Sequence, residues 1–429
     1  MRRSDDIERE IRSHTLPGLP EGLIVPDYRG YSICSVPRFI RALFGDRVDR
    51  AEAFAPLLPD LLPDRVVFLL LDGVGYLHLN RLRASFPDLF LNRLIDGGKF
   101  VPLTSTLPAT TATALASYNT GLTPQEHGML GYRLYLKETA AITNMVRLSL
   151  LGNGQGDSAL AAGIDLKTFL GEMTLYDHLA QLGVQAHILL SKYIATSGLS
   201  RLIYDGGTQS HPVVNFSDML VTTRHILQEA RGKTFLSLYW GGTDAIAHTH
   251  GPQSEAFTAE LRSIDAALER ELAGRIDDTL LLISADHGFV AMEESDYIMI
   301  PDYPELARNL LLPPVGDTRA AYLFVREGKR KEVKEFITEH FGKDLLCLDS
   351  HEALEAGLFG LGKIKPEVPD RIGDLLVIST GSRALYYPYK DSAKLKGMHG
   401  GLTPQEMLVP FIMSRLSEES GSCCSGREV

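Results

Sequence analysis

The sequence is poor in cysteine. Its 429 residues include four cysteines, and no two of them form a CxxC pair. This scarcity excludes a disulfide framework and a zinc site built from cysteines. Cys423 and Cys424 are adjacent in a segment rich in glycine and serine. We expect residues 416–429 to be a disordered tail, the ordinary state of a terminus, rather than a lipidation or metal-binding site.

Long apolar runs are also missing. No segment approaches 18 uninterrupted apolar residues, so no transmembrane helix is expected. The sequence begins Met1-Arg2-Arg3 and stays polar, without the apolar region of a secretory signal. The cytoplasm is therefore the default location.

Positive charge does not dominate either. The 43 lysines and arginines are outnumbered by 54 aspartates and glutamates, which gives a formal net charge of -11. Such a chain has no overall attraction for a nucleic acid polymer or an anionic membrane. A small nucleotide remains a candidate substrate, because bound cations can reverse the sign of the local field.

The sequence does contain a regular alternation of strands and helices. Residues 65–72, RVVFLLLD, form a continuous apolar run that predicts a strand buried on both faces. Further strands alternate with helical segments, which predicts right-handed crossovers and an α/β fold with a doubly wound, mostly parallel sheet. The further strands of this sheet are expected at 100–103, 184–190, 234–240, 279–284, 374–380 and 408–413.

The pattern changes after Asp286. Short strands and one helix follow, which predict a small α/β cap inserted into the core. The first 60 residues carry many prolines and few clear periods, so we expect irregular structure there. The predicted division is 1–60 for the irregular segment, 61–290 and 371–415 for the catalytic core, 291–370 for the cap and 416–429 for the tail.

Acidic residues and histidine recur where the predicted strands end. Asp72 ends the first strand, Asp244 follows the strand at 234–240, and Asp286 and His287 follow the strand at 279–284. In a doubly wound sheet these strand ends converge on one crevice. Three buried carboxylates would repel one another, and a divalent cation relieves that cost.

Spacing supports a metal site. Asp244 and His248 are four residues apart, so a helical turn places them on one face. Carboxylate and imidazole ligands suit zinc, with manganese or iron as alternatives. His399 lies on a glycine-rich loop before the last strand, and His250 is a less well spaced alternative to His248. The remaining candidates, which we expect to be structural or surface residues, are His78 and His127.

A nucleophile candidate lies in the segment TSTLPATTATALASYNTG, residues 104–121. Thr110 and Thr111 stand at the start of a predicted helix, where free backbone N–H groups and the helix dipole favour a bound phosphate. A threonine hydroxyl becomes a nucleophile when a metal lowers its pKa. If no metal were bound nearby, the threonine would instead be explained as the N-cap of the helix.

These motifs, in this order, resemble the alkaline phosphatase superfamily. They are most similar to its type I phosphodiesterase/nucleotide pyrophosphatase branch and span about residues 72 to 410. The matching elements are Asp72 after a strand, TTATALASYNTG around Thr111, DAIAHTHGP at 244–252, ADHG at 285–288 and HGG at 399–401. The resemblance implies an alkaline-phosphatase-like core and hydrolysis of a small phosphate ester, with a nucleotide as one candidate and zinc as the metal.

The resemblance also implies a role for each residue. The family's spacing to Thr120-Gly121 makes Thr111 the nucleophile, which would form a phosphothreonine that water then hydrolyses. The backbone N–H of Ala112 would contact the phosphoryl oxygens. One zinc would be held by Asp244, His248 and His399, and the other by Asp72, Asp286, His287 and Thr111.

One position departs from the family pattern. Nucleotide pyrophosphatases have an asparagine 21 positions after the nucleophile, and this chain has Tyr132 there, followed by Arg133. Tyr132 and Arg133 are therefore candidate substrate contacts, although Arg133 is equally well explained as a surface residue. The departure keeps a phosphomonoesterase or a phosphate-transferring mutase open as alternatives. A more distant alternative is a non-catalytic module that binds a metal or a nucleotide.

Overall fold

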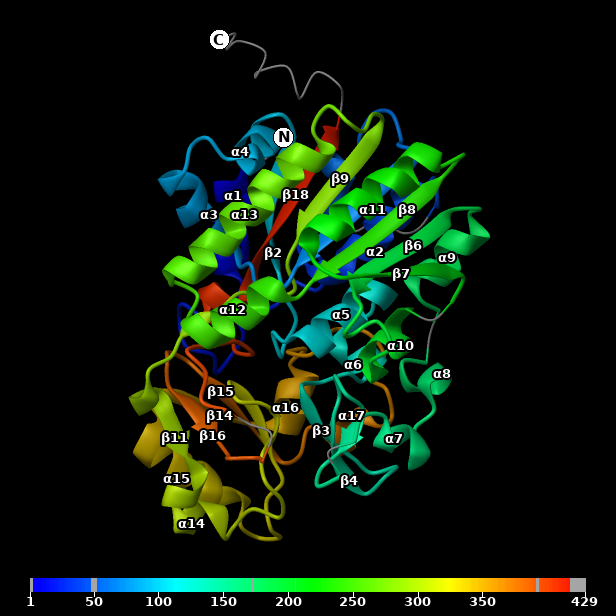
Figure 1. Ribbon diagram of the computed structural model, residues 1–429. Coiled ribbons are helices and arrows are strands. Elements are labelled where there is room, and N and C mark those ends of the chain that lie inside the picture. The colour runs from blue at the N-terminus through cyan, green and yellow to red at the C-terminus, as the bar shows by residue number, and fades with distance from the viewer. Residues whose placement is uncertain are drawn as a thin grey trace.

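The described residues form two seven-stranded sheets stacked as two tiers, each with helices around it (Figure 1), and two small two-stranded sheets. The computed structural model describes residues 3–47, 52–153, 155–171, 173–204, 206–390 and 393–416. The predicted tail, including Cys423 and Cys424, lies outside the described residues apart from Leu416.

The upper tier is built on a seven-stranded, mostly parallel sheet in the order β2-β18-β9-β1-β8-β6-β7. Neighbouring strands from β9 to β7 run parallel, and β18 runs antiparallel to both β2 and β9. The strands are β1 (Arg65–Leu71), β2 (Lys99–Thr104), β6 (Gln185–Ser191), β7 (Thr208–Val213), β8 (Thr234–Trp240), β9 (Thr279–Ser284) and β18 (Leu408–Leu416).

Helices cover both faces of this sheet, with α11 (Phe216–Glu229) and α13 (Glu255–Leu272) on one face and α2 (Val36–Leu43) on the other (Figure 1). Because both faces of the sheet are covered, the sequences of β1 and β9 are continuous apolar runs and do not alternate between apolar and polar residues. The arrangement confirms the predicted fold class. Other helices of this tier are α1 (Ser4–Ser13), α3 (Tyr76–Ser85), α4 (Phe90–Asp96), α5 (Thr111–Thr120), α9 (Leu175–Gln181), α12 (Gly242–His250) and α18 (Pro404–Met407).

The lower tier is built on a second seven-stranded sheet in the order β14-β15-β13-β12-β3-β4-β5, whose strand pairs are antiparallel. Helix α15 (Arg330–Phe341) packs on it through Val333, Ile337 and Phe341. The strands are β3 (Arg133–Leu136), β4 (Ala141–Asn144), β5 (Ser149–Leu150), β12 (Val315–Asp317), β13 (Ala320–Leu323), β14 (Leu345–Asp349) and β15 (Leu375–Ser379).

Two expectations about individual elements are wrong. The strand expected at 374–380 does not continue the main sheet, because β15 pairs with β13 and β14 in the lower tier. Its side chains are buried throughout, and an unbroken apolar run does not reveal which sheet a strand joins. The first 60 residues are not simply irregular, since they contain α1 and α2. Ile7 and Ile11 bury one face of α1, and Ser4 of the same helix bonds to Phe100 of β2.

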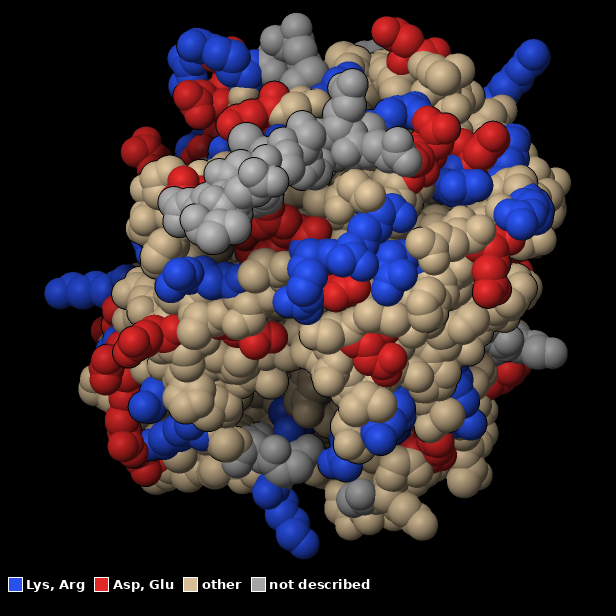
Figure 2. Space-filling model, turned by 45° about the horizontal axis from the view of Figure 1, so that its top comes forward, with Lys and Arg blue, Asp and Glu red and all other residues tan. Residues whose placement is uncertain are grey.

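The outer surface is mixed in charge. Basic and acidic side chains are interspersed over the face shown in Figure 2, so this face carries no broad surface of one sign. None of the described helices is both long and apolar enough to cross a membrane.

Candidate functional site

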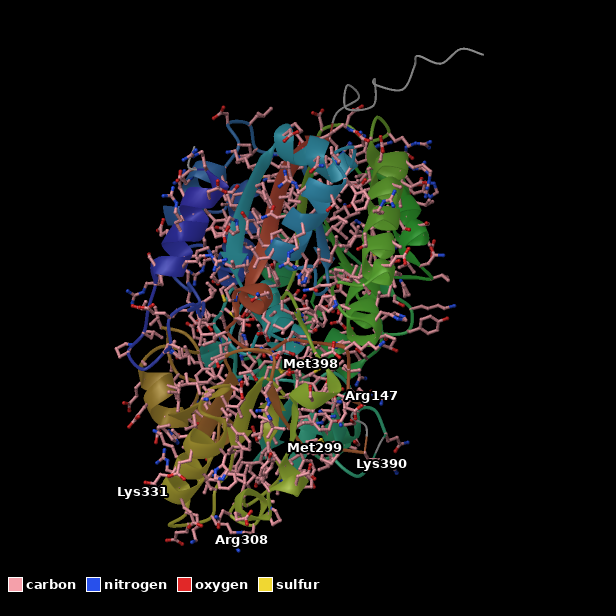
Figure 3. The ribbon with its side chains drawn as sticks, turned by 90° about the vertical axis from the view of Figure 1, so that its left-hand side faces the viewer. Arg147, Met299, Arg308, Lys331, Lys390 and Met398 are labelled. Atoms are coloured by element: carbon pink, nitrogen blue, oxygen red, sulfur yellow. The ribbon has the colours of Figure 1, made fainter. Side chains whose placement is uncertain are left out.

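A cavity of about 400 Å³ lies where the two tiers meet. Its floor is formed by residues at the ends of main-sheet strands, and its opposite wall by residues of the second sheet. Met398, which lines the cavity, lies between the two tiers in Figure 3. This is the crevice at the strand ends that a doubly wound sheet provides for ligands.

Six of the residues expected as metal ligands form two groups beside this cavity. Within each group the candidate ligand atoms all lie within 4.8 Å of one another. The first group is Asp244, His248 and His399, and the second is Asp72, Asp286 and His287. The structure therefore joins the six residues in the same two sets that the resemblance implied, although they come from four separate segments.

Local structure explains how each residue reaches its group. Asp72 directly follows β1, and Asp286 and His287 follow β9. Asp244 and His248 project from successive turns of α12, with Oδ1 and Nε2 3.3 Å apart. His399 arrives on the loop before β18, which is held near α5 by backbone pairing of Gly400 with Ala109.

All three histidines present the same nitrogen to their group. The Nδ1 atoms of His248, His287 and His399 lie 2.8, 3.2 and 3.0 Å from backbone carbonyl oxygens of Gly397, Gly288 and Ala109. A carbonyl only accepts, so each Nδ1 carries the proton and donates it. In a neutral imidazole with this tautomer, Nε2 keeps the lone pair that a metal ligand requires.

The carboxylates point unsatisfied oxygens at those lone pairs. One buried oxygen of each of Asp72, Asp244 and Asp286 has no hydrogen-bond partner among the described residues. These same oxygens of Asp72 and Asp286 lie 3.5 and 3.4 Å from Nε2 of His287. Lone pairs that face lone pairs in a buried site need a cation between them. The donor set of oxygen and imidazole nitrogen fits zinc, and also manganese or iron.

The electrostatics of these side chains lead to the same requirement. Burial, together with the negative charges of Asp286 and Asp244, raises the pKa of Asp72 well above its usual value. Burial also raises the pKa of Asp244. The pKa of His399 is lowered well below its usual value by burial and by the neighbouring His287 and His248. A divalent cation favours ionised carboxylates and neutral imidazoles, so it would reverse the first two shifts and reinforce the third.

The side chain of Thr111 contacts a histidine of the second group. It is the first residue of α5, and its Oγ1 lies 3.3 Å from Nε2 of His287. Thr110 is the N-cap residue, and its side chain makes no capping bond. Both threonines line the cavity, and Ala112 is the next residue of the same helix turn.

The other candidate histidines lie outside both groups. His127 is buried and bonded to Ser117 and to the backbone N–H of Met129. His78 packs edge-on against Phe257. His250 is exposed at the end of α12.

Tyr132 and Arg133 belong to the cavity wall contributed by the second sheet. The guanidinium of Arg133 lies over two aromatic rings, 4.7 Å from the centroid of Tyr132 and 4.6 Å from that of Tyr389. This stacking fixes a positive charge on the wall of the cavity that contains both groups of candidate ligands. Arg133 is therefore not simply a surface residue.

Sequence reasoning missed three residues around the site. The hydroxyl of Tyr239 donates to Oδ2 of Asp72, and Thr243 donates to the backbone carbonyl of Asp72 at 2.6 Å. Asp317 lines the cavity from the second sheet, and burial raises its pKa to about 6. Tyr239 had a weak signal, because it lies on the strand that precedes Asp244. Asp317 had none, since no motif in its local sequence distinguishes it from the other acidic residues of the predicted cap.

Comparison with known proteins places this geometry in context. A family model described as type I phosphodiesterase/nucleotide pyrophosphatase matches residues 66–402. Among curated proteins, no sequence matches the chain.

Solved structures resemble the chain in fold. Murine ectonucleotide pyrophosphatase/phosphodiesterase 5 has a TM-score of 0.61 at 16% identity, covering 82% of this chain and 88% of that one. An inactive variant of the murine protein was solved with AMP. Phosphonoacetate hydrolase from Sinorhizobium meliloti, solved with phosphonoformate, has a TM-score of 0.60 at 19% identity, covering 83% of this chain and 91% of that one.

Proposed function

Because the chain belongs to the type I phosphodiesterase/nucleotide pyrophosphatase family of phosphoester hydrolases, we propose that it is a two-metal enzyme that cleaves small phosphate esters with Thr111 as nucleophile. The observation that carries this proposal is the pair of ligand groups in which carboxylate oxygens without a hydrogen-bond partner face the Nε2 atoms of histidines whose Nδ1 atoms donate to backbone carbonyls.

The proposed metal ligands follow the two groups. Asp244, His248 and His399 would hold one ion. The other would be held by Asp72, Asp286, His287 and Thr111. Two divalent cations, which we propose to be zinc, would polarise the phosphoryl oxygens, lower the pKa of the Thr111 hydroxyl and stabilise charge on the leaving oxygen.

The protein's own groups carry the rest of the reaction. The oxygen of Thr111 attacks phosphorus, the bond to the leaving oxygen breaks, and the phosphoryl group is left on the threonine. The start of α5, including the backbone N–H of Ala112, favours the negative phosphoryl oxygens through the helix dipole. Water then attacks the phosphothreonine in line and breaks the bond between phosphorus and the Thr111 oxygen. This restores the Thr111 hydroxyl and releases a phosphate monoester when the substrate is a diester, or inorganic phosphate when it is a monoester.

The cavity supports a small substrate. A volume of about 400 Å³ suits a small molecule. Arg133 and the aromatic rings of Tyr132 and Tyr389 would bind the part of the substrate beyond the scissile bond, through charge and stacking. The complexes of similar folds with AMP and with phosphonoformate support a small anionic ligand.

Arg133 also keeps a second candidate function in view. A phosphate monoester carries one more negative charge than a diester, and a fixed guanidinium in the cavity favours that extra charge. A phosphomonoesterase or a phosphate-transferring mutase is therefore the alternative reaction at the same site.

A paired assay tests both functions. Zinc-loaded protein is given bis-(p-nitrophenyl) phosphate and p-nitrophenyl phosphate side by side, with Thr111→Ala as the control. Faster diester cleavage that the variant lacks supports the phosphodiesterase, and faster monoester cleavage supports the alternative. No turnover of either ester by protein that has bound its metals would leave only a non-catalytic binding role.

A further inference from the structure

The hexapeptide Gly-Leu-Thr-Pro-Gln-Glu occurs twice in the chain, at residues 121–126 and 401–406. Each copy begins a short helix, with threonine at the N-cap and proline at the first helical position. The two glutamates therefore have the same local sequence. Any difference between them comes from their surroundings in the fold.

The first copy shows what this hexapeptide does by itself. The carboxylate of Glu126 accepts from the backbone N–H and the hydroxyl of Thr123, at 2.9 and 2.7 Å. This is a capping box that satisfies the start of the helix. Glu126 does not line the cavity.

The second copy uses its glutamate differently. Glu406 is fully buried and forms a bidentate ion pair with Arg319, with N–O distances of 2.6 and 2.9 Å. It also accepts from the hydroxyl of Thr403 and, at 2.8 Å, from the backbone N–H of Gly401. The backbone bond thus goes to the loop before the helix rather than to the N-cap residue.

Glu406 accepts hydrogen bonds from two backbone N–H groups in loops that carry candidate metal ligands. Gly401, bonded to its carboxylate, comes two residues after His399. Gly288, whose N–H donates to the backbone carbonyl of Glu406 at 2.8 Å, directly follows His287. One residue therefore fixes the position of a ligand loop from each of the two groups.

Arg319 connects this point to the cavity wall. It lies at the turn between β12 and β13, and its remaining N–H groups donate to the carbonyls of Gly381 and Ser382. The same turn carries Asp317 and Thr318, which line the cavity. The buried pair thus joins the second sheet to the loops of His287 and His399.

The plainer explanation is that the pair only stabilises the fold. A buried ion pair is a poor device for that purpose, because the cost of removing both charges from water offsets most of their attraction. Apolar side chains of the same volume would serve stability equally well. A bidentate ion pair whose other hydrogen-bonding groups are also satisfied holds its two residues in a fixed geometry.

We propose that Glu406 and Arg319 are positioning residues, which set the two candidate metal-ligand loops relative to each other and to the cavity wall. The inference rests on the proposed metal site. It goes beyond that site because neither residue touches a metal or a substrate.

Three variants test it: Glu406→Gln, the double variant Arg319→Met/Glu406→Gln, and Glu126→Gln as the matched control in the identical hexapeptide. Zinc affinity is measured by competition with a chromophoric chelator, and ligand geometry by the visible spectrum of the cobalt-substituted protein. Urea unfolding of the metal-free protein gives the stability of each variant.

We expect Glu406→Gln to weaken zinc binding by about 10–100-fold, as loss of a residue behind the ligands does, and to change the cobalt spectrum. The double variant leaves no unpaired buried charge, so its unfolding midpoint should recover while its zinc affinity stays weak. Glu126→Gln should alter neither zinc affinity nor the spectrum.

Recovery of zinc affinity together with stability in the double variant would overturn the positioning role and leave a structural one. The same holds if Glu406→Gln binds zinc like the unaltered protein. If the unaltered protein bound neither zinc nor cobalt, the proposed function would fail, and this inference with it.

Discussion

The imidazole rings of His287 and His399 stack face to face, with their centroids 3.6 Å apart and their planes inclined by 18°. They belong to different ligand groups, so the stack is a direct packing contact between the two proposed metal sites. His248 makes a looser contact with His399, at 5.1 Å between ring centroids. The two sites should therefore be coupled mainly through His399.

This coupling predicts different results for two histidines of the same group. His248→Ala should lose one metal and keep the other at nearly normal affinity. His399→Ala should lose the same metal and also weaken the second, because His287 loses its packing partner. Elemental analysis of metal content after dialysis against a zinc buffer distinguishes the two. Equal metal content in both variants would contradict the coupling.

Two substitutions of Thr111 test whether its hydroxyl is the nucleophile. Thr111→Ala should lower kcat by about a thousandfold or more, because loss of a nucleophile leaves only the contribution of binding and electrostatics. Thr111→Ser keeps a hydroxyl and should retain part of the activity. Mass spectrometry of acid-quenched reactions should find a phosphorylated peptide from residues 104–121 in the unaltered protein. The serine variant can form the same adduct, and the alanine variant should not. A phosphorylated Thr111→Ala peptide would point to another nucleophile.

Tyr239 should act through Asp72. Tyr239→Phe removes the donor to Oδ2 of this buried carboxylate, so metal affinity should fall by about 10-fold. Tyr176→Phe is the matched control, because it removes the hydroxyl of another buried tyrosine that does not line the cavity. Chelator competition measures both. Similar losses of zinc affinity in the two variants would show that the effect is general to the fold.

Arg133 should set the preference for substrate charge. Arg133→Met keeps an unbranched side chain between the two tyrosines and removes the charge. The ratio of kcat/KM for a monoester to that for a diester should fall by about 10-fold, the equivalent of about 1.4 kcal/mol for one charged contact. Arg308→Met is the control, since Arg308 lies in the lower tier far from Met398 (Figure 3). An unchanged ratio would remove Arg133 from the substrate site.

His127 should make stability depend on pH. Burial lowers the pKa of this histidine from 6.5 to about 3. Nδ1 accepts from the N–H of Met129, so the folded protein has no place for a second proton. Between pH 6.5 and about 3 the unfolded chain binds more protons, so this contribution to stability is complete above pH 6.5 and is lost as the pH falls.

Between these two pKa values, His127 should change the free energy of unfolding by up to about 1.4 kcal/mol per pH unit. His127→Gln removes the titrating group, so its unfolding free energy should vary less between pH 7 and 4. Urea denaturation at a series of pH values measures this, with the exposed His340→Gln as control. Parallel curves for the unaltered protein and His127→Gln would contradict the assignment.

The ligand groups could be predicted because each residue is tied to a local pattern. Asp72 and Asp286 end apolar runs, and His248 is one helical turn from Asp244. Parallel strand ends converge whatever the rest of the chain does. The roles of these residues as metal ligands stay a prediction, as do zinc itself and the cytoplasmic location.

The cavity wall could not be predicted in the same way. Arg133 and Gly316 are register partners in the second sheet, although they are far apart in the sequence. Short strands of three or four residues carry too little periodicity to reveal such partners. Arg319 and Glu406 are likewise joined only by the folded chain, and the local sequence of Glu406 predicts the capping box seen at Glu126.

The place of β18 in the main sheet has a consequence for synthesis. This strand lies between β2 and β9, so a nascent chain cannot close the sheet until residues 408–416 have left the ribosome. Until then β2 and β9 each present an unpaired edge that other chains can use as a template. His399 also emerges long after Asp244 and His248, so the candidate ligand group that these three residues form is complete only at that late stage. We expect the unpaired edges of β2 and β9 to favour aggregation during this interval.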